Sequence, residues 1–278
     1  MSHSPHIPDP DRDTAASGLD TTVAHNARVW NYWLGGKDNF AVDRQVGDQV
    51  RDMFPVISDV ARADRQFLAR AVGFLAGEAG IRQFLDIGTG LPTANNTHEV
   101  AQAIAPDSRI VYVDNDPLVL VHARALLVSS ALGSTDYISA DVHDPDKIVP
   151  EAARTLDFGQ PVAVMMLGIL NFVMDTDDAQ AIVHRLMDAV PVGSYLALTH
   201  PTTELGGEAN VAAMAFWNEH AAPPIRARTG SEIARFFDGL DLLDPGLVSC
   251  SQWRPETSDA PVPQYGTVPQ YGAVARKP

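Results

Sequence analysis

The stretch Phe84-Leu-Asp-Ile-Gly-Thr-Gly-Leu-Pro-Thr93 decides the fold, because it begins as an apolar run and breaks into a glycine turn. Residues 81–87 are too few for a helix and mostly apolar, which predicts a buried strand. Gly88 and Gly90 let the backbone turn sharply and approach a ligand without an intervening Cβ. A helix ending at Pro106 is expected next. A strand, a glycine turn and a helix N-terminus together predict a nucleotide-binding corner.

A second β-rich run, Arg109–Val113, strengthens this interpretation. Asp114 follows it, 24 residues beyond Gly90. In a βαβ nucleotide fold, an acidic residue roughly 20 residues beyond the glycines accepts hydrogen bonds from ribose hydroxyls. Asp116 and Pro117 resemble the N-cap and first turn of the next helix. We therefore expect Asp116 to be structural and Asp114 to be the free carboxylate at the ribose.

The kind of nucleotide depends on two residues of the same corner. A dinucleotide fold wants a third glycine, where this chain has Thr93. Asp86, just before the glycines, would also repel a pyrophosphate. Both features disfavour a nicotinamide-dependent oxidoreductase, which stays as an alternative. A ligand with a cationic end would tolerate Asp86 better.

The Asp-x-Gly-x-Gly pattern resembles motif I of the class I S-adenosylmethionine-dependent methyltransferases. Together with Asn26–Phe40 and Ser251–Pro255, it makes the chain resemble an actinobacterial methyltransferase family long catalogued as a domain of unknown function, from about Val23 to Lys277. The resemblance implies an α/β, Rossmann-like class I methyltransferase fold with a mostly parallel seven-stranded sheet, helices on both faces and an N-terminal helical cap. It implies S-adenosylmethionine as the cofactor and leaves the acceptor open.

The resemblance also implies roles for individual residues. Asp86 would hold the amino acid end of the cofactor, directly or through water, and Asp114 the ribose. Asp141 would take the adenine amino group, and the next backbone amide a ring nitrogen. The alternative for Asp141 is a residue that merely opens an acidic turn, and His143 beside it is too little to predict a metal site. The expected cofactor-binding residues are Asp86, Gly88, Thr89, Gly90, Asp114, Asn115, Asp141, Val142, Gly168 and Asn39.

Strands later in the chain supply candidates for the methyl-transfer site. Pro161–Leu167 is apolar throughout, as in a central parallel strand, so Asn171 just beyond it should line the cleft. The motif that would indicate an amine substrate is absent after this strand. His200 follows the next predicted strand and is a candidate general base, although a hydrogen-bonded loop histidine is an equal alternative.

Two predicted helices precede the glycine corner. In the first, the apolar residues from Val23 to Leu34 recur at helical spacing, followed by a polar cluster around Asn39. The resemblance makes this segment a lid, with Tyr32 and Asn39 facing the ligand and the neighbouring tryptophans packing. An ordinary amphipathic helix with an exposed loop is the alternative.

Asp59–Glu78 is the second predicted helix. Asp64 and Arg65 near its start are expected on a solvated face, although an arginine so close to the lid could hold a carboxylate. The segment between His200 and the capping box at Thr229, including a helix over Glu208–His220, is the expected substrate-specificity region. Its Met214 and Trp217 would serve either a pocket or the core.

Composition limits the remaining possibilities. The 278-residue chain is 45% hydrophobic and has a formal charge of −15, which disfavours nucleic acid and anionic membranes as partners. One cysteine and no signal or membrane-spanning run predict a cytosolic protein. We expect a disordered tail over 1–20, a helical cap over 21–80 and a methyltransferase domain over 81–278. The expected function is methyl transfer to a small-molecule acceptor, with a non-catalytic S-adenosylmethionine-binding sensor as alternative; the oligomeric state is not predicted.

Overall fold

A mostly parallel sheet forms the centre of the computed structural model, which describes residues 20–126, 129–255 and 266–278. Its strand order is β4-β3-β2-β5-β6-β10-β8, and β9 pairs with β10 beside this path. The strands are β2 (Gln83–Ile87), β3 (Arg109–Asp114), β4 (Ser134–Ser139), β5 (Ala163–Leu167), β6 (Tyr195–Pro201), β8 (Asp241–Leu242), β9 (Val248–Ser249) and β10 (Gln270–Arg276). Only β10 runs against its neighbours. The predicted α/β class and mostly parallel sheet are confirmed. The sheet has eight strands in the described residues rather than the predicted seven, because the short β8 and β9 both pair with β10.

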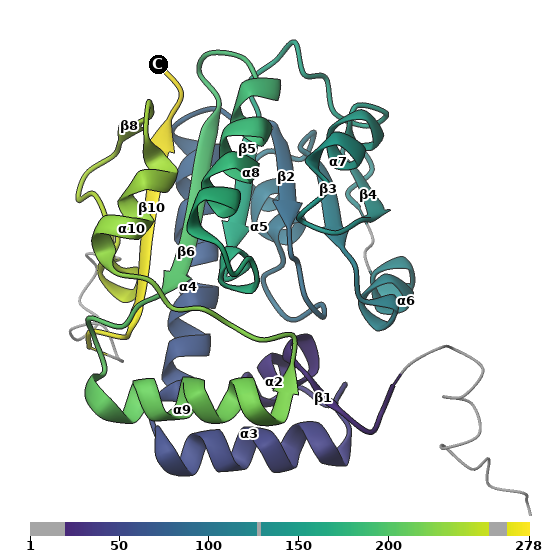
Figure 1. Cartoon of the computed structure of the whole chain (residues 1–278). Coiled ribbons are helices and arrows are strands. Elements are labelled where there is room, and N and C mark those ends of the chain that lie inside the picture. Colours follow the sequence, from purple (N-terminus) through teal and green to yellow (C-terminus); the bar gives the residue numbers. More distant parts are fainter. Residues whose placement is uncertain (1–19, 127–128, 256–265) are drawn as a thin grey trace, which may run out of the picture.

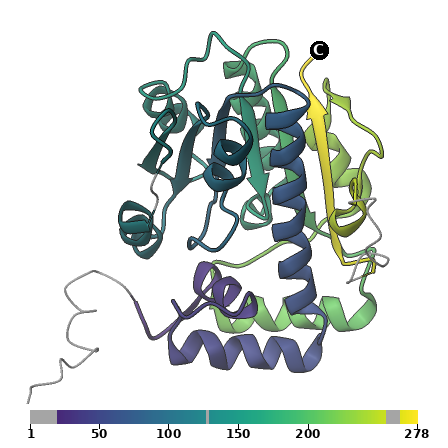
Figure 2. The same cartoon turned by 180° about the vertical axis from the view of Figure 1, so that it is seen from behind.

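Helices cover both faces of the sheet, because the central strands carry apolar side chains on both sides. Every residue of β2 is buried, as the short apolar run requires. One face packs against α4 (Ile57–Gly77) and α5 (Thr97–Ile104), which lie in front in Figure 2. The other packs against α7 (Pro145–Ala152), α8 (Thr176–Ala189) and α10 (Gly230–Ala234), in front in Figure 1.

Carboxylates cap the N-termini of two helices, at the predicted Asp116 and also at Asp144. Asp116 accepts a hydrogen bond from the backbone N–H of Leu118 at 2.8 Å, at the start of α6 (Pro117–Leu126). Asp144 accepts one from Lys147 N–H at 3.1 Å at the start of α7. Such caps satisfy backbone donors that the first turn leaves free, so the connections after β3 and β4 are locally defined.

Three further helices lie beyond the carboxyl ends of the parallel strands and form a cap: α2 (Asn26–Trp33), α3 (Ala41–Met53) and α9 (Gly207–His220). α9 lies beside α3 in Figures 1 and 2. β1 (Ala24–His25) pairs in parallel with β7 (Ala221–Ala222), which joins the N-terminal segment to the end of α9. The sequence predicted no helix at α3. The cap therefore combines helices that precede residue 80 with one that follows it. The predicted boundary between cap and methyltransferase domain at residue 80 stays a prediction.

The strand order places a crevice at the end of the sheet that faces this cap. From β2 the chain continues outward through β3 and β4, then returns to β5 on the other side of β2. Ligands of open α/β sheets bind at this change of direction, beyond the carboxyl ends of the strands. The predicted tail lies almost wholly outside the described residues. Within the described part of the chain, no helix combines the length and apolarity that crossing a membrane requires.

Candidate functional site

The glycine turn after β2 brings the backbone close to the segment after β5. Gly88 and Gly90 have φ angles of +76° and +64°, a region that favours glycine. A Cβ on Gly88 would lie 2.5 Å from the side chain of Ile169. The N–H of Gly88 donates to the carbonyl of Val113 at 2.8 Å, which ties the turn to the end of β3. A side chain at Gly88 would therefore push apart the two sides of the crevice, which are the glycine turn and the segment after β5.

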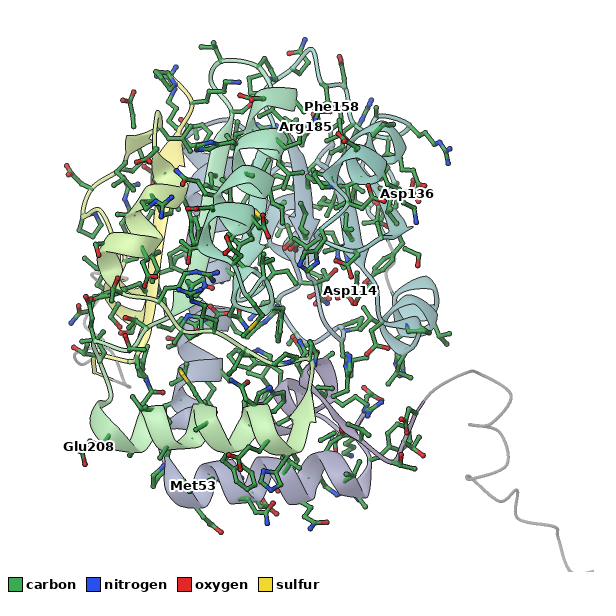
Figure 3. All side chains as sticks on the ribbon, in the orientation of Figure 1. Met53, Asp114, Asp136, Phe158, Arg185 and Glu208 are labelled. Carbon is green, nitrogen blue, oxygen red and sulfur yellow. The ribbon has the colours of Figure 1, made fainter. Side chains whose placement is uncertain are left out.

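Asp114 lies at the sheet end that faces the cap (Figure 3). Its two oxygens accept hydrogen bonds from the backbone N–H groups of Gly90 and Asp116, both at 2.9 Å. The sequence predicted a free carboxylate here, whereas the structure binds it to the glycine turn. Burial raises its pKa, and these two N–H donors oppose the rise. Each oxygen keeps a second lone pair, so the carboxylate can still accept ligand hydroxyls.

A hollow beside Asp114 also brings Asn115, Asp141 and Val142 together. Asn115 donates to Asp141 Oδ2 at 2.8 Å, and the His143 N–H donates to Asp141 Oδ1 at 2.9 Å. The carboxylate is therefore held at the rim of the hollow, about half exposed. These four residues come from the ends of β3 and β4, as the sequence predicted.

A larger cavity continues from this hollow toward the cap, since Gly88, Gly90 and Gly168 line both. Including their open mouths, this cavity contains about 1350 Å³ of unoccupied space and the hollow beside Asp114 about 1020 Å³. The two hollows therefore form one continuous cleft that extends from the ends of β3 and β4 to the cap.

Asp86 and Arg65 lie where the larger cavity meets the glycine turn. Asp86 is buried and accepts a hydrogen bond from Thr97 Oγ1 at 2.6 Å. Burial raises its pKa to about 6, although Thr97 and the nearby Arg65 oppose the rise. Arg65 donates to the carbonyls of Ala94 and Asn95 at 2.9 Å, while its buried Nε has no partner. A carboxylate and a guanidinium side by side suit a zwitterionic ligand.

Asn171 reaches the cavity from η1 (Leu170–Phe172), directly after β5. Its side chain is 6% exposed, and its Oδ1 has no hydrogen-bond partner. Gly168, with a φ of +61°, begins the same turn and leaves the passage beside it open. Both residues lie at the crevice, where the sequence predicted them.

Tyr32 and Asn39 lie away from the cavity, contrary to the prediction that they face the ligand. Tyr32 OH donates to Asp48 at 2.7 Å, on the side of α2 that packs against α3. The Asn39 amide donates to Asn31 Oδ1 and to the Gly36 carbonyl, both at 3.0 Å. The residues of α2 that line the cavity are instead Trp30, Asn31 and Trp33. Asn39 therefore holds in place the side chain of Asn31, which lines the cavity.

His200 lies inside the core, so it does not fit the predicted role of general base. The ring is fully buried, its Nδ1 lies 2.8 Å from the Pro201 carbonyl, and its Nε2 lies 2.8 Å from the guanidinium of Arg228. Burial lowers its pKa to about 3. β6 alternates its side chains between faces, and position 200 points to the α8 and α10 side. This neutral histidine is an acceptor for Arg228.

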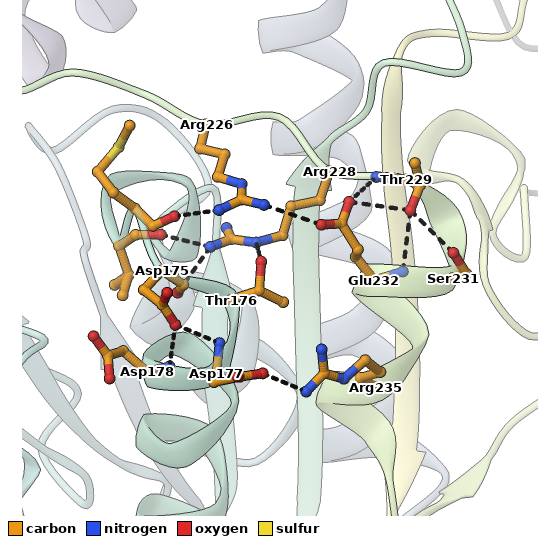
Figure 4. Close-up of polar contacts among 12 residues, drawn as sticks. Asp175, Thr176, Asp177, Asp178, Arg226, Arg228, Thr229, Ser231, Glu232 and Arg235 are labelled. Carbon is orange, nitrogen blue, oxygen red and sulfur yellow. Dashed lines mark hydrogen bonds and ion pairs between the residues drawn. The ribbon is translucent and has the colours of Figure 1, made fainter.

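Arg228 fixes the backbone that carries Asn171. Its guanidinium donates to the carbonyls of Leu170, Val173 and Asp175 at 2.6–3.1 Å. Figure 4 shows this side chain and Arg226 spanning the space between the turn before α8 and the segment before α10. No sequence pattern indicated that this arginine is buried with its guanidinium fully hydrogen-bonded.

Asp64 is the functional candidate that sequence reasoning placed on a solvated face. It is 6% exposed, lines the larger cavity and accepts a hydrogen bond from Gln270 Nε2 at 2.8 Å. Burial raises its pKa, which hydrogen bonds from Thr199 and Gln270 partly oppose. A signal was available: Val60, Asp64 and Phe67 share one helical face, so the acid stands within the apolar stripe of α4.

Comparison with known proteins identifies the family of this fold and cleft. The family model described as S-adenosyl methyltransferase matches residues 12–278. The chain belongs to this family. The methyltransferase assignment and the cofactor, S-adenosylmethionine, follow from that membership and agree with the resemblance seen in the sequence.

Two solved structures are similar over nearly the whole methyltransferase. A DUF574 family protein from Streptomyces avermitilis MA-4680 is 45% identical, with a TM-score of 0.87, covering 93% of this chain and 99% of its own. A protein from Thermobifida fusca YX, provisionally named a methyltransferase, is 40% identical, with a TM-score of 0.83, covering 94% of this chain and 97% of its own. No curated protein matches.

Proposed function

We propose that this methyltransferase transfers the methyl group of S-adenosylmethionine to a small-molecule acceptor held under the helical cap. The observation that carries the proposal is the continuity of the two hollows at Gly88, Gly90 and Gly168. One hollow has carboxylates at the ends of β3 and β4, and the other is covered by α2, α3 and α9. An extended cofactor fits the first hollow and the entrance of the second, which leaves the space under the cap for the acceptor.

The nucleoside end would occupy the hollow beside Asp114. Asp114 is held rigidly by two backbone donors and has lone pairs left for ribose hydroxyls. Asp141 and the backbone of Val142 would receive the adenine edge, with Asn115 holding the Asp141 carboxylate. Thr89, whose hydroxyl lies 3.3 Å from Tyr137 OH, would keep the glycine turn in place.

The amino acid end would meet Asp86 and Arg65. The ammonium would neutralise a carboxylate whose burial is otherwise unfavourable. The cofactor carboxylate would give the buried Arg65 Nε the partner that it lacks. This assigns Arg65 a role that the sequence left open.

The chemistry asks mainly for positioning, because the sulfonium supplies an electrophilic carbon and a neutral leaving group. Holding the nucleophile in line with the methyl carbon and sulfur lowers the entropic part of the barrier. The cap helices exclude water from the same space. Asn171 would orient the acceptor through its unpartnered amide oxygen.

Calorimetric titration with S-adenosylmethionine, S-adenosylhomocysteine and NAD tests the proposal, using wild type, Asp114→Ala and Asp136→Ala. Asp136 is an exposed acid on β4, remote from Asp114 in Figure 3, and serves as the matched control. We expect both sulfur ligands to bind, NAD not to bind, and only Asp114→Ala to weaken binding by roughly tenfold, or about 1.4 kcal/mol. Preferential NAD binding, or equal affinities in both variants, would contradict the proposal.

No described feature favours the two alternatives. The structure keeps Thr93 where a dinucleotide fold requires its third glycine, and Asp86 beside the turn. A sensor without acceptor chemistry would have no use for a capped second cavity containing a buried acid. Formation of S-adenosylhomocysteine during turnover separates an enzyme from a sensor.

A further inference from the structure

The charges that line the cavity under the cap balance those of the cofactor. Among its described lining residues, the charged side chains are Asp64, Arg65 and Asp86. S-adenosylmethionine adds an ammonium, a sulfonium and a carboxylate. With both acids ionised, these six charges sum to zero. A charged acceptor would leave an uncompensated charge in a desolvated space, which costs free energy, so the balance favours a neutral acceptor.

The cap side of the cavity is apolar and aromatic. It is lined by Trp30 and Trp33 of α2, Val50 of α3, and Met214 and Trp217 of α9. Trp33 Nε1 already donates to the Gly47 carbonyl at 3.1 Å, and Trp217 Nε1 to the Pro223 carbonyl at 3.0 Å. Because these indole N–H groups are bonded to backbone, the rings offer the cavity their apolar surfaces. Such a lining suits a ring-containing apolar body.

Asp64 lies beside the end of β5, where cofactor and acceptor must meet. Its partner Gln270 also donates to Thr199 Oγ1 at 3.2 Å, which fixes the amide between β6 and α4. A Cβ on Gly168 would lie 3.8 Å from the same Gln270 Nε2. The carboxylate is therefore held by the neutral donors Gln270 and Thr199, next to the turn that also carries Asn171. It is the one described acid that lines the cavity without also lining the smaller hollows at the glycine turn.

We propose that the acceptor is a neutral, largely apolar ring compound bearing a hydroxyl group, and that Asp64 is the base for its O-methylation. The acceptor oxygen forms a bond to the methyl carbon while the carbon–sulfur bond breaks, and its electron pair stays on sulfur. The hydroxyl proton passes to the Asp64 carboxylate. Asn171 Oδ1 offers a second acceptor in the same cavity. This assignment rests on the proposed function and adds the acceptor class and the base.

Binding of three matched probes tests the acceptor class. 1-Naphthol, 1-naphthylmethylamine and 1-naphthoate share one ring system and are neutral, cationic and anionic at pH 7. Calorimetry on the full chain saturated with sinefungin, a non-reactive cofactor analogue that carries an ammonium in place of the sulfonium, should show 1-naphthol binding at least tenfold more tightly than either charged probe. A preference for a charged probe, or no binding of any probe, overturns the acceptor class. Failure of sinefungin itself to bind would instead overturn the proposed function.

A pair of variants on α9 tests where the probe binds. Ala213 is buried and lines the cavity, whereas Val211 on the same helix is 50% exposed. Ala213→Phe should weaken 1-naphthol binding at least tenfold and leave S-adenosylhomocysteine affinity within twofold. Val211→Phe should change neither. Equal 1-naphthol affinities in the two variants would overturn the placement under the cap.

Asp64→Asn tests the base, because the amide can keep a hydrogen bond with Gln270 but cannot take a proton. General bases typically contribute roughly 10²–10⁴-fold to rate. Mass spectrometry should show methyl transfer to 1-naphthol slowed at least about 100-fold, with the 1-naphthol and S-adenosylhomocysteine affinities within threefold of wild type. Transfer at the wild-type rate overturns the role of Asp64. Preserved S-adenosylhomocysteine binding shows that the variant is folded.

Discussion

Acidification should weaken cofactor-product binding through Asp86. In the unliganded protein, burial raises the pKa of this carboxyl to about 6, against the opposing effects of Thr97 and Arg65. It is therefore about 90% protonated at pH 5 and about 10% at pH 7. If the ligand ammonium binds only the ionised form, affinity for S-adenosylhomocysteine falls roughly tenfold from pH 7 to pH 5, or about 1.4 kcal/mol.

The sign of the effect follows from the raised pKa. A bound ammonium lowers the pKa of Asp86 again, so binding near pH 6 releases a proton. The affinity for S-adenosylhomocysteine therefore has its full value above pH 7 and decreases as the pH falls through 6. In the unliganded protein the same raised pKa acts oppositely: the folded state holds the proton more tightly than the unfolded chain, so stability declines from about pH 4 to about pH 6.

Titration calorimetry with S-adenosylhomocysteine at pH 5, 6 and 7, in two buffers of different ionisation enthalpy, measures both affinity and proton release. About half a proton should be released per ligand at pH 6. Asp86→Asn should abolish the dependence, whereas Asp64→Asn, at the acceptor end, should keep it. Equal affinities at pH 5 and 7, or proton uptake, would refute the assignment of the ammonium to Asp86.

Further variants probe the supports of the site. Arg228→Met should lower the free energy of unfolding in urea by about 3–5 kcal/mol, because it leaves buried carbonyls without a donor. Arg235→Met, which removes an exposed ion pair, should lower it by about 0–1 kcal/mol. Similar losses in the two variants would contradict the structural role of buried Arg228. Gly88→Ala should weaken S-adenosylhomocysteine binding at least tenfold, while Gly80→Ala, with similar φ and open space, should not. Tyr32→Phe should bind S-adenosylhomocysteine with an affinity within twofold of wild type. A larger loss of affinity would indicate that Tyr32 does face the ligand.

The sequence was most informative where local chemistry alone determines structure. The glycine turn, the N-cap at Asp116 and the position of Asp114 after a strand all follow from short-range rules, and the structure has each of them. It was less informative about Asp114 itself, since a backbone donor on Gly90 approaches this carboxylate only after β2 and β3 pair.

The missed features depend on which way a side chain points in the assembled fold. His200 faces the α8 side of β6, whereas its neighbour Thr199 faces Gln270 and α4. One residue of register on a strand thus separates a core histidine from a cleft residue. Tyr32 and its neighbour Asn31 differ in the same way around α2: Tyr32 bonds to α3, a helix that the sequence had not predicted, whereas Asn31 lines the cavity.

The position of Asp64 within its helix already carried a signal of function. A lone acid in the apolar stripe of an otherwise regular helix is costly to bury unless it has a partner, so its position already indicated a function. The partner, Gln270, is 206 residues away and could not be inferred from the sequence.

A crystal structure of the chain with S-adenosylhomocysteine would test the cofactor site atom by atom. We expect ribose hydroxyls within about 3 Å of Asp114, the amino group beside Asp86, the carboxylate at Arg65 and the sulfur directed under the cap. A ligand bound elsewhere, or one whose amino acid end points away from Asp86 and Arg65, would refute the proposed site.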